Sequence, residues 1–179
     1  LSISIVLYKT PSLQLKKCIF SLQKIKELAD LYLIDNSPNT YLKKYKKLFL
    51  GAKYISLKSN EGYARGHNKA LDIASIKKYK YHLVLNADCY FESNVITKLI
   101  DIMDKNKNIG LIMPKVLNSD GTLQKLCKFI PKPTDLFISL FLKLLKLDSF
   151  FRPTHLISKD ILNKPCFVPY LSGCFMFLR

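Results

Sequence analysis

The chain has 179 residues, 49% of them hydrophobic, including ten Tyr and eleven Phe. This length and composition exclude global disorder and predict one globular domain over residues 1–179. The formal net charge of +16 suggests a polyanionic partner, but 26 of the 29 basic residues are Lys, whereas bidentate recognition of bases and phosphates favours Arg. We therefore expect most lysines to be solvated and expect no nucleic-acid partner. The alternative interpretation of the charge is a basic module that binds RNA or a membrane and has no catalytic activity.

The first hundred residues alternate between two patterns. Apolar, β-branched and aromatic runs predict strands over residues 2–8, 31–34, 53–57 and 81–85. Apolar residues at helical spacing predict helices over residues 13–28, 41–49, 64–76 and 93–104, with Ser12 and Ser93 as caps. Strand and helix alternate four times, which predicts right-handed crossovers and an α/β fold of three layers around a mostly parallel central sheet.

The later part of the chain departs from this alternation. A fifth strand is predicted over residues 109–117, and a tight turn over 118–121 then predicts a hairpin. Residues 166–177 predict two extended pieces around a bend at Ser172 and Gly173. The five cysteines are odd in number and widely spaced, which predicts reduced thiols in a cytosolic chain.

Residues 136–147 form the most apolar segment of the chain. Its exceptions, Ser139, Lys143 and Lys146, fall on one helical stripe. At twelve residues the segment is too short to span a bilayer. It fits either a helix that lies in a membrane interface or a buried helix that closes the fold.

The predicted strand over residues 81–85 is an apolar run that stops at Asn86 and Asp88. Four consecutive apolar residues predict a strand buried on both faces, with the polar pair at its carboxyl end. A carboxylate at that position faces the crevice in which open α/β sheets bind ligands. Asp88 is therefore either a ligand-binding residue or a cap of the next helix.

Polar clusters follow all four strands predicted in the first half of the chain. They comprise Lys9 with Thr10, residues 35–37, residues 60–62 and residues 86–88. Because the carboxyl ends of parallel strands share one edge of a sheet, these clusters can converge on one ligand. Four features of these clusters suit a nucleoside diphosphate. They are an acid near a ribose or base, a Gly that admits close backbone approach, Arg65 near a helix start and a metal-binding Asp.

The order and spacing of these segments resemble the family 2 glycosyltransferases of the GT-A, Rossmann-like fold, especially the bacterial rhamnosyltransferase-like branch. The resemblance covers nearly the whole chain. Residues 4–9 resemble the first strand of the family, and residues 33–37 resemble its V-D-N-x-S strand end. Residues 60–68 are similar to the N-x-G-F-A-x-G-x-N loop, residues 85–88 to the L-N-P-D form of the DXD motif, and residues 172–174 to the x-G-A segment.

The resemblance implies an inverting glycosyltransferase that moves a hexose from a dTDP- or UDP-linked sugar to a hydroxyl of a surface polysaccharide or a lipid-linked acceptor. It implies that Asp35 contacts the base and that residues 60–68 shape the pocket around ribose and diphosphate. Asp88 would hold Mg²⁺ or Mn²⁺, with Asn86 in place of the first acid of the motif. The predicted donor-binding residues are Thr10, Asp35, Asn60, Gly62, Arg65, Asn68, Asn86 and Gly173, and the predicted metal ligand is Asp88.

The catalytic base is not predicted within these residues. In family 2 enzymes it is an Asp that follows the x-G-A segment, and no acidic residue follows Ser172 here. The resemblance thus predicts a base beyond Arg179 and one nucleotide-sugar-binding domain that is incomplete at its C-terminal, acceptor end. We expect His67 to be a surface or packing residue rather than a catalytic base. The expected location is the cytoplasm or the inner face of the cell membrane, with peripheral contact through residues 136–147.

Overall fold

The computed structural model describes residues 1–124, 126–127, 133–144 and 164–179. These residues form two compact units, one of Leu1–Pro114 with Gly173–Arg179 and the other of Lys115–Ser172. The prediction of one domain over residues 1–179 stays a prediction, because compactness alone does not decide whether a unit folds independently.

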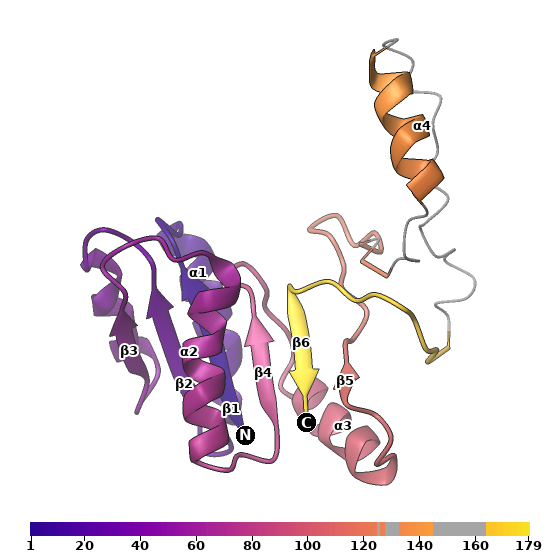
Figure 1. The fold of residues 1–179 in the computed structure, drawn as a ribbon. Helices are drawn as coiled ribbons and strands as arrows, with labels where there is room; N and C mark the ends of the chain where they lie inside the picture. Colours follow the sequence, from indigo (N-terminus) through magenta and orange to yellow (C-terminus); the bar gives the residue numbers. More distant parts are fainter. Residues whose placement is uncertain (125, 128–132, 145–163) are drawn as a thin grey trace. The chain divides into compact units, whose positions relative to one another are not determined.

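The first unit is built on a sheet that has six strands among the described residues, in the order β3-β2-β1-β4-β6-β5 (Figure 1). Their bounds are β1 (Ser2–Leu7), β2 (Asp30–Asp35), β3 (Lys53–Ser56), β4 (His82–Leu85), β5 (Leu111–Ile112) and β6 (Phe175–Leu178). β1 pairs in parallel with β2 and β4, and β2 pairs in parallel with β3. β6 is antiparallel to both β4 and β5. The prediction of a mostly parallel sheet is therefore confirmed.

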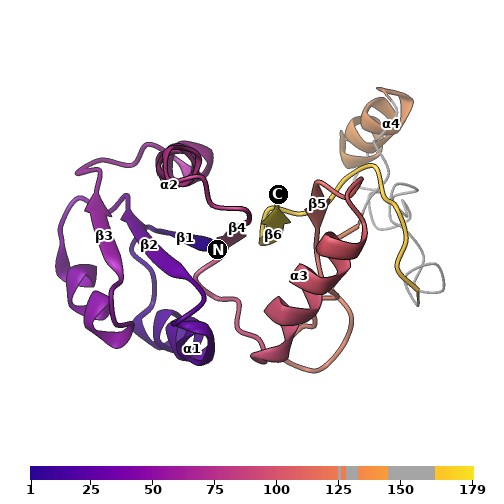
Figure 2. The same ribbon diagram turned by 90° about the horizontal axis from the view of Figure 1, so that it is seen from below.

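Helices cover both faces of this sheet. They are α1 (Ser12–Leu22), the 3₁₀ helices η1 (Gln23–Ile25) and η2 (Tyr41–Leu48), α2 (Tyr63–Ile76) and α3 (Asn94–Lys105). Figure 2 shows α2 on one face of β1, β2 and β3, and α1 on the other. The predicted three-layer α/β architecture is confirmed.

The alternation of side chains along the strands divides the core between the two faces. On one face Ile3, Ile5 and Leu7 of β1 are fully buried in a cluster with apolar side chains of α1, η2 and α3. On the other face Tyr32 and Ile34 of β2 pack with a smaller set of apolar residues from α2, from β1 and from β3 and the residue that follows it. The larger core therefore lies on the α1 side, and α2 closes the opposite side alone among the described helices of this unit.

Several predicted boundaries are wrong. The helix predicted over residues 13–28 ends at Leu22, because the chain tightens into η1 and buries Ile25 there. Ser12 is the first residue of α1 rather than its cap, since Pro11 occupies the cap position. Ser93 does precede α3, but its side chain makes no capping hydrogen bond. The strand predicted over residues 109–117 is only two residues long, because β5 pairs with no more than the end of β6.

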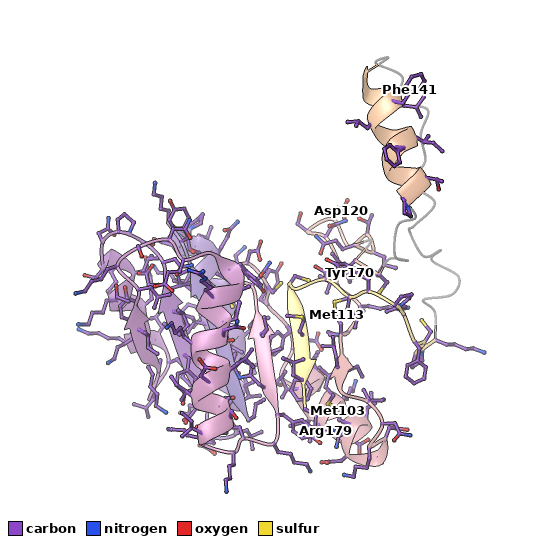
Figure 3. The ribbon with its side chains drawn as sticks, in the orientation of Figure 1. Met103, Met113, Asp120, Phe141, Tyr170 and Arg179 are labelled. Atoms are coloured by element: carbon purple, nitrogen blue, oxygen red, sulfur yellow. The ribbon has the colours of Figure 1, made fainter. Side chains whose placement is uncertain are left out.

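The end of β6 is fastened to α3. Arg179 donates hydrogen bonds from its guanidinium to the main-chain carbonyls of Met103, Asn106 and Ile109. Figure 3 shows Arg179 beside Met103 at this end of the unit. These carbonyls follow or end α3, so a cation satisfies acceptors that the helix itself leaves open.

The second unit contains the predicted hairpin turn and a helix. Leu117 and Leu123 form an antiparallel bridge, and the amide of Asn118 donates to the carbonyl of Thr122 at 2.8 Å, which confirms the hairpin. Helix α4 spans Pro133–Leu144. Residues 145–147 of the predicted apolar segment lie outside the described residues. The five cysteines are all described, and no disulfide joins them in this structure. That the thiols are reduced stays a prediction.

A chain of buried polar side chains links β1 and β4 to α2. His82 lies between two serines of β1, with Nδ1 2.8 Å from Oγ of Ser2 and Nε2 2.8 Å from Oγ of Ser4. The hydroxyl of Ser4 is also 2.7 Å from Nδ1 of His67 on α2. Burial lowers the pKa of both His67 and His82 from the ordinary value of 6.5 to about 4. His67 is thus a packing residue, one of the two alternatives predicted for it, and the folded protein holds both rings neutral.

This chain predicts acid-sensitive stability. Between pH 6.5 and 4 these histidines are protonated in the unfolded chain but remain neutral in the folded protein. The free energy of unfolding therefore falls as the pH falls. At pH 5 the linkage amounts to about 2 kcal/mol for one such histidine. The variant His67→Gln, whose side chain can still bond Ser4, should lose less stability between pH 7.5 and 5 in urea unfolding. An identical pH dependence in the variant and the parent would contradict this account.

Candidate functional site

The candidate site lies at the carboxyl ends of β1, β2, β3 and β4. β1 has β2 on one side and β4 on the other, so the direction of the sheet's winding changes between β1 and β4. Open α/β sheets bind ligands at such a switch point, beyond the carboxyl ends of the strands. The four polar clusters predicted from the sequence therefore follow neighbouring strands of one sheet edge.

The ends of β1 and β2 are joined by hydrogen bonds. The amide of Lys9 donates to Oγ of Ser37 at 2.9 Å, and the amide of Asn36 donates to the carbonyl of Leu7 at 2.8 Å. Lys9 has φ 49°, a left-handed conformation that is uncommon for residues other than Gly. Thr10 is half-buried, and its hydroxyl accepts a hydrogen bond from the amide of Tyr8 at 3.2 Å. The turn that carries Thr10 is thus held by β2.

Asp35 is a buried acceptor of hydrogen bonds at this edge. Its carboxylate is fully buried, where it accepts hydrogen bonds from the amide of Ser37 at 2.8 Å and from the hydroxyl of Tyr54 on β3. Burial and the bond to Asp35 both raise the pKa of Tyr54, so the phenol stays protonated and donates. Contact between Asp35 and a nucleotide base, which the family resemblance implies, stays a prediction, and both oxygens of the carboxylate already accept hydrogen bonds within the protein.

The loop after β3 leads into α2 through a left-handed glycine. Gly62 has φ +85° and occupies the position before the first turn of α2. Its amide donates to Oδ1 of Asn60 at 3.0 Å, and its carbonyl accepts from Nδ2 of Asn36 at 3.0 Å. Asn36 is itself buried, and its Oδ1 has no hydrogen-bond partner among the described residues. The residue that follows β2 therefore fixes the loop that, by the family resemblance, is expected to surround a ribose and a diphosphate.

The first turns of α2 lie close against β1. A Cβ on Gly66 would stand 2.7 Å from Cγ2 of Val6, so only glycine allows this approach without a shift. Arg65 and Asn68 are exposed on the same helix, and no acidic residue lies in its first turn. The amino end of α2 is therefore electropositive and is held near the carboxyl end of β1.

The carboxyl end of β4 meets the turn that precedes β6. The amide of Asn86 donates to the carbonyl of Cys174 at 2.9 Å. The hydroxyl of Tyr63, in the first turn of α2, donates to the carbonyl of Gly173. Gly173, which is 110 residues from Tyr63 in the sequence, thus comes beside both the loop before α2 and the end of β4.

Asp88 is the exposed carboxylate of this arrangement, and Asn86 is half-buried beside it in the sequence. The described residues include no cluster of three or more His, Cys, Asp or Glu side chains that could hold a metal ion unaided. One carboxylate and one amide oxygen fit a hard divalent ion that takes most of its ligands from a diphosphate and water. The residues present therefore suit a metal that arrives with its nucleotide.

The structure brings most of the predicted residues to one edge, but it gives several of them structural tasks. Asn60 and Thr10 accept hydrogen bonds within their own turns, and Asp35 is buried. Sequence reasoning missed three residues that hold the edge together, which are Asn36, Tyr54 and Tyr63. Asn36 and Tyr63 lie inside the quoted motifs, whereas Tyr54 carries no signal beyond its place in β3.

Comparisons with known proteins agree with this geometry. The family described as Glycosyl transferase family 2 matches residues 2–164. The crystal structure of S. aureus TarS 1–349 is similar, with a TM-score of 0.56 and 20% identity over 72% of this chain and 41% of that chain. The structure of TarS 1–349 in complex with UDP has a TM-score of 0.53 and 20% identity over 70% of this chain and 39% of that one. No curated protein matches the chain.

These similarities support the assignment of the fold. At 20% identity the similarity to TarS supports the architecture rather than any shared substrate, and the predicted GT-A fold is confirmed. The present chain spans about two fifths of the length of the TarS chains it matches.

The contact between Tyr54 and Asp35 can be tested through stability. Tyr54→Phe removes the donor and leaves a buried carboxylate oxygen without its partner, which should cost about 1–3 kcal/mol in the free energy of unfolding. Tyr90→Phe is the matched control, because Tyr90 is exposed and its hydroxyl makes no hydrogen bond among the described residues. Equal urea midpoints for the two variants would show that Tyr54 does not support Asp35.

Proposed function

Because the chain belongs to glycosyl transferase family 2, we propose that it transfers a hexose from a nucleoside-diphosphate sugar to a hydroxyl group of an acceptor. The acceptor is proposed to be a surface polysaccharide or a lipid-linked saccharide. The observation that carries the proposal is the exposed carboxylate of Asp88, which follows β4 at the switch point between β1 and β4. Ligands of open α/β sheets bind at this position.

The donor is proposed to be a UDP- or dTDP-linked sugar. Arg65 and the amino end of α2 supply positive charge and free amide donors for the diphosphate. Gly62 keeps side-chain atoms away from the loop, so a sugar nucleotide can approach the backbone closely. The proposal of UDP is supported by the TarS structure determined with UDP, which has the same fold.

Asp88 is proposed to be the protein's carboxylate ligand to Mg²⁺ or Mn²⁺, with the side-chain oxygen of Asn86 as a neutral neighbour. When bound, such an ion neutralises the charge that builds on the departing nucleoside diphosphate. Asn86 is held in place from both sides, because its amide donates to Cys174 and its carbonyl accepts from the amide of Cys89 at 3.2 Å. This backbone anchoring fixes the direction in which the chain leads to Asp88.

Transfer with inversion is proposed from the family resemblance. A single displacement needs a general base for the acceptor hydroxyl and no enzymic nucleophile. The base that the resemblance places beyond Arg179 stays a prediction. Gly173 is proposed to lie beside the donor sugar, since Tyr63 ties its carbonyl to the start of α2.

Peripheral membrane contact through α4 is part of the proposal. No helix among the described residues is long and apolar enough to span a bilayer. Large apolar side chains are nevertheless exposed on α4, and Figure 3 shows Phe141 projecting from it. These exposed side chains are Phe137, Ile138, Leu140 and Phe141. Such a helix suits a membrane interface better than a buried position, and we propose a location in the cytoplasm or on the inner face of the cell membrane.

The metal role of Asp88 is tested by calorimetry with UDP as the probe. Asp88→Asn should weaken UDP binding in Mn²⁺ by at least tenfold, and it should change little when the metal is chelated, because only the metal-bridged contact is lost. Asp72→Asn removes an exposed carboxylate from α2 and should leave both affinities unchanged. Unchanged affinity of Asp88→Asn in Mn²⁺ would remove Asp88 from the site.

A salt titration against both labelled RNA and UDP distinguishes the proposal from a basic polyanion-binding module. Such a module would bind RNA with a steep salt dependence and would show no preference for a nucleoside diphosphate. We expect UDP binding that is selective and metal-dependent.

The left-handed conformation of Gly62 predicts a selective loss of binding. Gly62→Ala forces a Cβ into φ +85°, at a cost of about 1–2 kcal/mol, and should weaken UDP binding at least tenfold because the loop shifts. Gly51→Ala is a matched control, since Gly51 has φ +80° and open space around it but lies before β3, away from this edge. It should lose similar stability and keep its UDP affinity. A Gly62→Ala variant with unchanged UDP affinity would contradict the proposed role of the loop.

A further inference from the structure

A second surface of the first unit combines exposed apolar side chains with lysines. Two adjoining hollows share Gln23, Lys24 and Lys26 in their walls. The first hollow, of about 470 Å³, is also lined by Phe20, Lys47 and Leu50, and the second by Leu28. We call the surface formed by Phe20, Lys24, Lys26, Leu28, Lys47 and Leu50 the basic–apolar patch.

The patch is held together by contacts between the elements that carry it. Phe20 lies in the last turns of α1, Lys24 in η1, and Lys47 at the end of η2. The side-chain amide of Gln23 donates to the carbonyl of Leu48 at 2.6 Å, which joins η1 to the end of η2. Ile25 and Phe49 are buried beneath this junction in the main core. The exposed side chains therefore stand on a fixed base.

The charge of the patch and its surroundings is strongly positive. Residues 12–51 contain eight lysines and three acids, of which Asp35 is buried and Asp30 is paired with Lys53. Glu27 is the remaining acid. Among the described residues, no carboxylate forms an ion pair with Lys24, Lys26 or Lys47. These ammonium groups are available for an anionic partner.

The apolar side chains of the patch are at least half exposed to solvent, so they contribute little to the core of this unit. Leu50 is 83% exposed, Leu28 54% and Phe20 51%. A soluble polyanion such as RNA would gain little from aliphatic side chains, and its recognition favours Arg and stacked aromatic rings. A lipid surface suits both the apolar side chains and the lysines of the patch. The apolar side chains enter the acyl boundary, and the lysines extend to anionic headgroups.

We propose that the basic–apolar patch docks this protein on an anionic lipid surface. The patch lies just before β2 and β3 begin, whereas Asp88 and Gly62 lie at the carboxyl edge of the sheet. β2 has six residues, so the two ends are about 20 Å apart. A docked unit would present its carboxyl edge, and any ligand bound there, away from the lipid. This inference does not depend on the proposed glycosyl transfer.

The test is sedimentation of the 179-residue chain with vesicles of phosphatidylcholine alone or with 30% phosphatidylglycerol. The parent chain should bind the anionic vesicles and not the neutral ones. Lys24→Gln with Lys47→Gln should weaken binding by about 25-fold, at about fivefold for each lysine near the surface. Phe20→Ser with Leu50→Ser should weaken it at least tenfold because the apolar contact is lost.

Matched variants on other surfaces serve as controls. Ile76→Ser removes an equally exposed apolar side chain from the end of α2, and Lys98→Gln with Lys115→Gln removes two exposed charges outside the patch. Both should bind vesicles within twofold of the parent. Urea midpoints check that every variant is folded. Patch variants that bind anionic vesicles as well as the parent would overturn the proposal and leave α4 as the contact.

A competition arm separates lipid from other polyanions. Soluble RNA should not displace the parent chain from anionic vesicles at equal phosphate concentration, since it offers no apolar layer. Displacement by RNA, together with full vesicle binding by Phe20→Ser and Leu50→Ser, would show an unselective polyanion surface and would also overturn the proposal.

Discussion

β1 pairs in parallel with β2 along its whole length on one side and with β4 over Ser2–Ile5 on the other. This pairing places the ends of three strands next to one another and makes β1 the point at which the winding of the sheet reverses. It also sets the alternation that sends Ile3 and Ile5 toward α1 and Ser2 and Ser4 toward α2. Both the core and the candidate site depend on this pairing.

The polar residues at the carboxyl edge act mainly on one another. Asn36 holds Gly62, Ser37 holds Lys9, and Tyr63 holds Gly173, so each turn is fixed by a neighbouring strand or helix. Such mutual support is what a binding site on loops needs, because positions must be set before a ligand arrives. It leaves Asp88, Arg65 and Asn68 exposed to meet one.

The sequence predicted much of this fold because its signals are local. Apolar runs and helical spacing located β1 to β4 and their helices, and the polar strand ends located the edge on which the site lies. The antiparallel pairing of β6 with β4 could not be predicted, because it joins Phe175 to Leu85 across 90 residues. The burial of Asp35 under Tyr54 was missed for the same reason, since a motif names a carboxylate but not the side chain that covers it.

The central claim is that the four strand ends form one nucleotide site. Hydrogen–deuterium exchange measured with UDP and Mn²⁺ tests it most directly, because each strand end reports separately. The account predicts that added UDP slows exchange together in residues 8–10, 36–38, 60–66 and 86–89, with no change in residues 20–28 and 47–51. Protection confined to the lysine-rich residues 16–28 and 43–51, or no protection at all, would contradict it.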